Sequence, residues 1–169
     1  MSTRRLALGF AAMLAACLLT GCPKTTYWSH DAVPIPDNNI DDWAVSTIEV
    51  SRSFTITDLN VTVNVTHPDI TDCDAWLVSP EGEIVPLIFL LSGADLVDTT
   101  FNDEASATID SGTSPYTGHW LVDSFYVNAG MFMVDGEDAQ GTWTLNFRDQ
   151  QAENVGEITS WGLRFNSAN

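Results

Sequence analysis

The sequence predicts an all-β protein, a β-sandwich of the jelly-roll type. Apolar and polar residues alternate along several short segments, which is the pattern of strands buried on one side. Glycine and proline separate these segments, and no part of the chain repeats apolar residues with a helical period. Many short strands without helices are typical of sandwiches and jelly rolls.

The first 21 residues are predicted to be an export signal. Arg4 and Arg5 precede an apolar run, residues 6–19, that is too short for a bilayer, which needs about 20 residues. Residues 19–22 (LTGC) resemble the bacterial lipobox, after which a lipid-modified cysteine becomes the N-terminus. We therefore expect Cys22 to carry lipid on an exported lipoprotein of the cell envelope, at the periplasmic face or the cell surface. Ordinary signal cleavage is the alternative.

A tether is predicted next, because residues 22–36 contain Pro23, Pro34 and Pro36 and show no sustained period. Fully extended, it could hold a domain about 40 Å from the membrane. Cleavage before Cys22 would leave 148 residues, enough for one domain, which we expect at residues 37–169.

Two strands are predicted in the first half of this domain. Residues 44–50 (AVSTIEV) form a short alternating segment. In residues 59–66 (LNVTVNVT) the leucine and the valines point one way and the polar side chains the other. The apolar residues just upstream are out of phase with this strand, which predicts a bulge or bend at Thr57 and Asp58.

A hairpin is predicted for residues 75–87 (AWLVSPEGEIVPL), where Pro80 and Gly82 supply the turn between two apolar flanks. Two C-terminal strands, residues 142–149 and 160–166, carry heavier side chains. Their one-sided apolar residues are Trp143, Leu145 and Phe147 in the first strand and Trp161, Leu163 and Phe165 in the second. The short connection between them predicts antiparallel neighbours. We expect these aromatic residues to form the core, with an exposed sugar-binding platform as the alternative.

The charge of the chain argues against a nucleic-acid partner. The net charge is −17, and removal of Arg4 and Arg5 leaves four basic residues against 23 acidic ones, or −19. Such a chain would be repelled by phosphate backbones. Carboxylates in surplus favour divalent cations as partners, because a bound cation relieves their repulsion.

Six short motifs occur in the order of a known family: residues 35–38 (IPDN), 66–82 (THPDITDCDAWLVSPEG), 98–105 (DTTFNDEA), 114–120 (SPYTGHW), 141–149 (GTWTLNFRD) and 156–165 (GEITSWGLRF). With them the chain resembles the P domain, or P/Homo B domain, that follows the catalytic domain of kexin- and furin-like proprotein convertases and of many bacterial subtilisin-like proteases. The resemblance implies a galactose-binding-domain-like jelly roll without catalytic residues. Such a domain stabilises or positions an attached protease and, in bacterial examples, often carries calcium.

No catalytic domain precedes the module in this sequence, so bracing a covalently attached protease is not the expected role. We expect instead a non-catalytic, membrane-anchored P/Homo B module that is stabilised by calcium and acts as a binding or scaffolding domain. Its partner would be a separate subtilisin-like serine endopeptidase or another envelope protein. A carbohydrate-binding accessory domain of the cell envelope is the alternative.

A catalytic role for Ser114 is not expected. Residues 112–114 resemble the start of the subtilisin nucleophile motif, which continues into a helix. Pro115 and the residues after it are instead typical of a turn. A nucleophilic serine also needs a base and an orienting acid. None of His30, His67 and His119 stands in a subtilisin-like motif.

Calcium binds six to eight oxygen ligands held by adaptable loops. The candidate ligands in this sequence are Asp72, Asp74, Asp98, Asp103, Glu104 and Asp149. Asp74 and Asp103 lie in the stretches most similar to the family and are the first choices. Plain solvated loops are the alternative reading, and the EF-hand template does not fit.

Cys73 is expected to be a passive thiol. Cys17 would leave with the signal and Cys22 would carry lipid, so Cys73 has no partner within the chain. The charges of Asp72 and Asp74 should raise its pKa and make it a poor nucleophile. Pairing with another molecule is the alternative. A zinc site is not expected, because the histidines and this cysteine show no ligand spacing.

Overall fold

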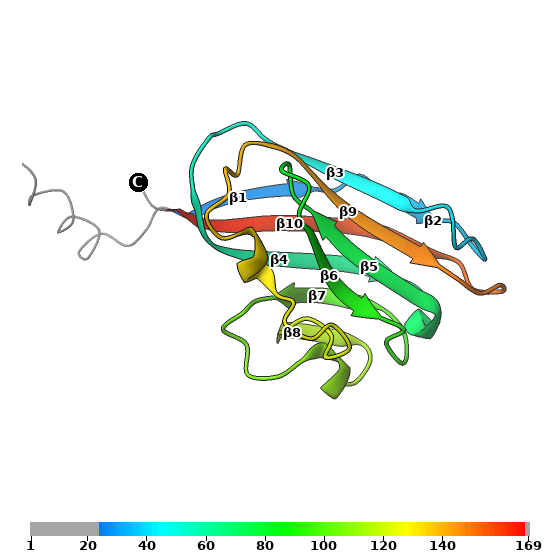
Figure 1. Ribbon diagram of the computed structural model, residues 1–169. Helices are drawn as coiled ribbons and strands as arrows, with labels where there is room; N and C mark the ends of the chain where they lie inside the picture. The colour runs from blue at the N-terminus through cyan, green and yellow to red at the C-terminus, as the bar shows by residue number, and fades with distance from the viewer. Residues whose placement is uncertain (1–23, 168–169) are drawn as a thin grey trace, which may run out of the picture.

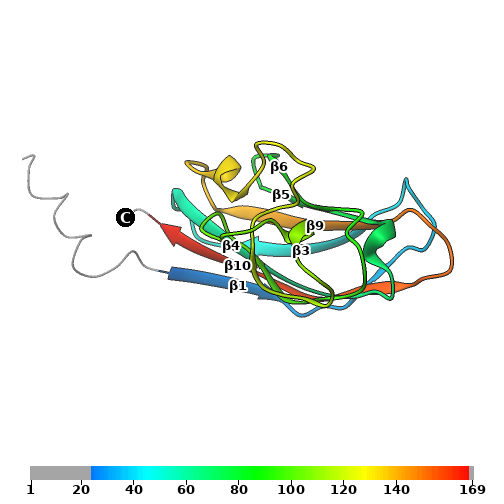
Figure 2. The ribbon, with the colours of Figure 1, turned by 90° about the horizontal axis from the view of Figure 1, so that it is seen from below.

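The computed structural model describes residues 24–167, which form two β-sheets packed face to face (Figures 1 and 2). The larger sheet contains β1 (Lys24–Ser29), β2 (Val33–Ile35), β4 (Ile56–Thr66), β7 (Leu96–Phe101), β8 (Tyr116–Trp120) and β10 (Gly156–Ser167). The smaller sheet contains β3 (Ala44–Val50), β5 (Cys73–Val78), β6 (Ile84–Phe89) and β9 (Gly141–Asp149). The predicted all-β sandwich is confirmed.

Strand order is β1-β10-β4-β7-β8 in the larger sheet, with β2 also paired to β10, and β3-β9-β5-β6 in the smaller. All strand pairs are antiparallel except β7 with β8, which run parallel. The only helices in residues 24–167 are short 3₁₀ turns: η1 (Ile70–Asp72), η2 (Ile109–Ser111) and η3 (Met131–Val134). None of these is long or apolar enough to span a membrane.

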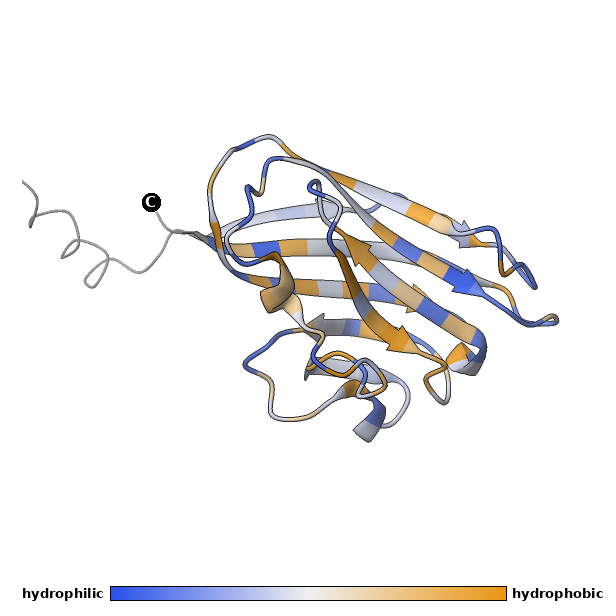
Figure 3. Ribbon diagram, in the orientation of Figure 1, coloured by the Kyte–Doolittle hydropathy of each residue, from blue (hydrophilic) through white to orange (hydrophobic). Residues whose placement is uncertain are grey.

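The core lies between the sheets and follows the predicted alternation, which Figure 3 shows along the strands of the smaller sheet. All six heavy C-terminal side chains are fully buried, as predicted: Trp143, Leu145, Phe147, Trp161, Leu163 and Phe165. The indole nitrogens of the two core tryptophans have partners: Trp161 donates to Ser46 Oγ at 2.9 Å and Trp143 donates to the Ala139 carbonyl at 3.0 Å. The aromatic residues are therefore core, and they offer no platform for sugars.

Two local predictions are confirmed. The pairing of β4 with β10 shifts register between Asp58 and Ile56, so that an extra residue at Thr57 restores the facing of the strand. The predicted hairpin is formed by β5 and β6, and Gly82 takes the positive φ of +94° that its turn requires.

The tether prediction is wrong for most of its length. Lys24–Ser29 forms β1, which pairs along β10, and Val33–Ile35 forms β2, which pairs with the start of β10. The physical reason is that β10 would otherwise expose a free edge of backbone donors and acceptors. Proline is accepted in β2 because this three-residue strand lies at the edge. The predicted signal peptide and Cys22 lie outside the described residues.

The predicted pairing of the two C-terminal strands is also wrong. β9 pairs with β3 and β5, whereas β10 pairs with β1, β2 and β4 in the opposite sheet. Their heavy faces meet across the core, where the rings of Trp143 and Phe165 lie edge to face with centroids 5.5 Å apart. The short connection therefore crosses between sheets. Alternation of apolar and polar residues identified the inward face of each strand, but it does not indicate which strand lies next to it in the sheet.

Candidate functional site

Four polar residues occupy neighbouring positions on the paired strands β5 and β9. Cys73 lies opposite Asp149, and Asp74 lies opposite Arg148. Because side chains alternate along a strand, the first pair points into the sandwich with Phe147, and the second pair points outward. One strand pair thus carries two polar clusters on its two faces.

The outward cluster is a closed ion pair, although Asp74 is only 1% exposed. Arg148 donates from Nε at 2.9 Å and from Nη2 at 2.6 Å to Asp74 Oδ2, and from Nη1 to the Ile40 carbonyl at 3.1 Å. Its guanidinium also lies over the Trp43 ring, 4.5 Å from the centroid. Asp74 is thereby neutralised by protein groups, which leaves it a poor choice as a calcium ligand.

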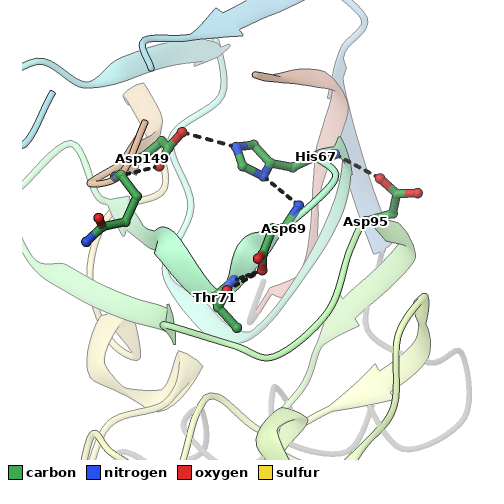
Figure 4. Close-up of polar contacts among 6 residues, drawn as sticks. His67, Asp69, Thr71, Asp95 and Asp149 are labelled. Carbon is green, nitrogen blue, oxygen red and sulfur yellow. Dashed lines mark hydrogen bonds and ion pairs between the residues drawn. The ribbon is translucent and has the colours of Figure 1, made fainter. Parts of the chain in front are cut away.

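The inward cluster contains His67, Cys73 and Asp149, which are each at most 1% exposed. Figure 4 shows the His67 ring and the Asp149 carboxylate pointing toward one another, with Nε2 and Oδ2 3.4 Å apart. The two atoms are within ion-pair distance but not aligned as a hydrogen bond, so neither has a hydrogen-bond partner. The Cys73 sulfur lies within 4.8 Å of the ligand atoms of both.

His67 is held in place by its surroundings. Its backbone N–H donates to Asp95 Oδ1 at 2.8 Å, and its Nδ1 accepts the Asp69 backbone N–H at 3.2 Å (Figure 4). A side-chain carbon at Gly156 would collide with the imidazole, so this glycine gives the ring its space. Since Nδ1 accepts a hydrogen bond, the ring proton is on Nε2 and faces Asp149.

Burial raises the pKa of the Cys73 thiol, and the charges of Asp149, Asp72 and Asp74 add to the effect. The predicted direction is confirmed, although burial rather than the adjacent charges is the main cause. The thiol is fully buried and lies within the core, so pairing with a second molecule has no access to it in the folded chain. The pKa of Asp72 is raised as well, by burial and then by Asp69 and Asp149.

The other predicted calcium ligands are spread over separate loops. Asp103 accepts the backbone N–H groups of Met131 and Phe132 at 2.9 and 2.6 Å, which fixes the start of η3. Asp98 and Glu104 are exposed. Within residues 24–167, no three of the six predicted carboxylates bring their oxygens within 4.8 Å of one another. The six acids therefore do not converge on one site in this structure, and the calcium site stays a prediction.

The cluster of His67, Cys73 and Asp149 was not predicted from the sequence, because ligand spacing along the chain does not show which strand ends meet. His67 directly follows β4, Cys73 begins β5 and Asp149 ends β9. Residues distant in sequence meet when strand ends lie at the same end of a sandwich. The available signal was that His67 follows the predicted strand 59–66, that Asp149 ends the predicted strand 142–149, and that Cys73 lies two residues before the predicted hairpin 75–87.

Ser114 serves a loop contact. Its hydroxyl donates to the Ala94 carbonyl at 2.6 Å and accepts the Ala94 backbone N–H at 2.8 Å. The hydroxyl therefore holds two loops together.

An exposed apolar patch consists of Phe125 and Val127, on the loop between β8 and η3, and Phe132, within η3. These side chains are 61%, 81% and 51% exposed. Val127 and Phe132 line a groove of about 420 Å³, while Phe125 stacks on Phe89 with ring centroids 4.1 Å apart. The buried carboxylate of Asp123 holds this loop against β6, because it accepts the backbone N–H groups of Phe125 and Phe89 at 2.9 and 3.3 Å.

Comparisons with known proteins agree with this architecture. The serine protease of Aeromonas sobria in complex with its chaperone aligns with a TM-score of 0.53 and 20% identity, over 87% of this chain and 27% of the protease. A second structure, of the serine protease of Aeromonas sobria, aligns with a TM-score of 0.51 and 20% identity, over 86% of this chain and 27% of that chain. The present chain thus spans about a quarter of those chains.

The sequence comparisons give the family. No curated protein sequence matches the chain. P domains are accessory, non-catalytic parts of subtilisin-like proteases. The sequence model of the proprotein convertase P-domain matches residues 56–165, and the chain therefore belongs to that family.

Proposed function

We propose that this protein is a non-catalytic accessory domain that docks on a separate subtilisin-like serine protease at the cell envelope. The observation that carries the proposal is the P-domain match over residues 56–165. The association of P domains with subtilisin-like proteases supports the choice of partner.

The apolar patch is the surface that we assign to docking. Monomers rarely leave large aromatic side chains this exposed, and clustered aromatic residues are enriched at the centres of interfaces. Carboxylates of Asp103 and Asp110 flank the two hollows beside the patch. The net charge of −17 adds to this, so we expect the partner to present an apolar side chain among basic residues.

The test measures binding of the purified protein to a secreted subtilisin-like protease from the same organism that lacks a P domain of its own. The double substitution Phe125→Ser and Phe132→Ser should weaken binding about tenfold or more, because truncated aromatic anchors cost most at an interface. Val155→Ser is the matched control, since Val155 is 68% exposed but lies on the β9–β10 connection. Equal loss in patch and control variants would contradict docking through the patch.

If the protein instead binds carbohydrate, the same purified proteins should give a different result. Soluble glycans would be retained by the wild-type protein and released by the patch substitutions, while no protease would bind. A hydrolase panel with Ser114→Ala as control tests the remaining class, and we expect no activity that depends on Ser114.

Membrane attachment through Cys22 is part of the proposal and rests on the lipobox-like residues 19–22. Metabolic labelling with a fatty acid should mark the wild-type chain and the Cys73→Ser variant but not Cys22→Ser. Labelling of Cys22→Ser would place the lipid elsewhere. Calcium is no part of this proposal, because the six predicted carboxylates do not converge on one site.

A further inference from the structure

The inward cluster is an unusual combination for the interior of a small sandwich. It gathers one nitrogen, one sulfur and one oxygen ligand type within 4.8 Å, all of them buried. His67 Nε2 and Asp149 Oδ2 have no hydrogen-bond partner, although each is shielded from water. Buried polar atoms without partners are costly, and they require an explanation that packing alone does not supply.

We propose that His67, Cys73 and Asp149 form a binding site for a divalent transition-metal ion, with zinc as the best match. Zinc takes imidazole nitrogen, thiolate sulfur and carboxylate oxygen, whereas calcium and magnesium take oxygen alone. The proposal is independent of docking on a protease and makes no use of the apolar patch.

The distances are close to what zinc needs. With bond lengths of about 2.0–2.3 Å, ligand atoms of a tetrahedral site lie roughly 3.3–3.8 Å apart. His67 Nε2 and Asp149 Oδ2 already lie 3.4 Å apart. The Cys73 sulfur lies within 4.8 Å of both, so an approach of roughly 1 Å completes the set. Three protein ligands leave the fourth position to a water molecule.

The surroundings supply part of an outer shell. Asp149 Oδ1 accepts the Gln151 backbone N–H at 3.0 Å, which turns Oδ2 toward the imidazole. The Asp95 carboxylate holds the His67 backbone at 2.8 Å, and Gly156 limits where the ring can go. Groups that orient ligands in this way contribute strongly to metal affinity.

Binding releases one proton. The Cys73 thiol loses this proton to solvent or buffer and becomes a thiolate. His67 stays neutral and must free its Nε2 lone pair for the metal, so its ring proton moves from Nε2 to Nδ1 in a tautomer change. That change ends the 3.2 Å contact in which Nδ1 accepts the Asp69 N–H. One long hydrogen bond is exchanged for three coordinate bonds.

The experiment titrates the chelator-treated full-length protein with Co²⁺ and then displaces the cobalt with Zn²⁺. We expect one ion per chain, a thiolate-to-cobalt charge-transfer band in the near ultraviolet and the visible spectrum of tetrahedral cobalt. Cys73→Ser should remove the band, and Asp149→Asn should weaken binding by at least about tenfold. His119→Gln and Asp98→Asn, which replace exposed residues of the same types, should bind as the wild type does.

A band that survives Cys73→Ser would come from Cys17 or Cys22 and would overturn the proposal, as would the absence of any cobalt spectrum in the wild type. Nitrogen NMR of the wild-type protein gives a second measurement that needs no variant. The His67 proton should move from Nε2 to Nδ1 when zinc is added. An unchanged tautomer at saturating zinc would also overturn the assignment, even where the variants fail to fold.

Discussion

Asp74 and Asp149 are two buried carboxylates on adjacent strands, each 1% exposed, and the fold treats them differently. Asp74 faces outward and receives two hydrogen bonds from one guanidinium. Asp149 faces inward, where its Oδ2 meets only an imidazole nitrogen at 3.4 Å. Each carboxylate has one oxygen without a hydrogen-bond partner, Oδ1 of Asp74 and Oδ2 of Asp149. The difference is that Asp74 is paired with an arginine, whereas the free oxygen of Asp149 lies beside a histidine and a thiol.

This difference separates a structural ion pair from a candidate binding site. A buried charge is tolerated when a cation and hydrogen bonds compensate for its desolvation. Arg148 does this for Asp74, and it also covers the rings of Trp43 and Trp76 on the outer face. Asp149 has no arginine partner among residues 24–167. Burial and an unpartnered oxygen are common to both carboxylates. What distinguishes Asp149 is the lack of a compensating arginine and the presence of two further metal-ligand types, imidazole and thiol, beside its free oxygen.

The largest effect is expected from removing the cation of the outward pair. Arg148→Met keeps the apolar stem on the tryptophan rings but leaves Asp74 as an uncompensated buried charge. The free energy of unfolding, measured with urea at pH 7, should fall by about 3–5 kcal/mol. Arg164→Met, at an exposed arginine, should change it by no more than about 0.5 kcal/mol.

The double variant Asp74→Leu/Arg148→Met sharpens the same test. Removing both charges should recover most of the loss, because the cost lies in the unpaired carboxylate rather than in the missing attraction. If the single and double variants were equally unstable, packing of Arg148 on the tryptophans would be the main contribution instead.

The second effect is a pH dependence that belongs to the inward cluster. Burial, with Asp149 next, raises the pKa of the Cys73 thiol. The unfolded chain therefore loses the thiol proton above about pH 8.5 while the folded chain keeps it. Stability is unaffected below that value and falls as the pH rises, by roughly 1.4 kcal/mol per pH unit.

The free energy of unfolding of the wild type and of Cys73→Ala should be measured with urea between pH 7 and 10, in the presence of a chelator. The difference between the two proteins at each pH gives the contribution of the thiol. Other titrating groups are shared by both proteins and cancel in the difference. The wild type should lose about 2 kcal/mol more than Cys73→Ala by pH 10. Parallel curves would mean that the thiolate is accommodated, and the contrast between the two clusters would weaken.

Much of the fold could be predicted because period-2 alternation reports which face of a strand is buried. It located β4 and its bulge at Thr57, and it identified Trp143 and Trp161 as core. Alternation does not report which strands pair, and so the partners of β9 and β10 were predicted wrongly. It also missed β1 and β2, where prolines in short edge segments looked like a tether.

The site was less predictable, because its members come from three strand ends that only the tertiary fold brings together. Asp74 and Asp103 were the first choices because they lie in the stretches most similar to the family. In the structure one is paired with Arg148 and the other binds two backbone N–H groups of η3. Asp149 was among the predicted ligands, but its neighbours His67 and Cys73 were assigned no role.

A smaller effect is expected at the inward carboxylate. Asp149→Asn keeps an acceptor for the Gln151 N–H but places an amide N–H opposite the N–H of His67 Nε2. In the presence of chelator the free energy of unfolding should fall by about 1–2 kcal/mol, less than for Arg148→Met. A loss as large as that of Arg148→Met would show that Asp149 is as tightly committed as Asp74.

The smallest effect is expected from calcium. The sequence predicted a domain that is stabilised by calcium, but Asp74 and Asp103 already have protein partners and the remaining predicted acids do not cluster. Melting curves with millimolar calcium and with EGTA should therefore coincide within about 1 °C, since a ligand stabilises the fold only as far as it binds the folded state. A shift of several degrees with calcium would mean that carboxylates outside the two clusters converge when the ion is present. Zinc added to the same samples provides the comparison: it should raise the melting temperature of the wild type but not of Cys73→Ser, so that a response to calcium and a response to the inward cluster can be told apart.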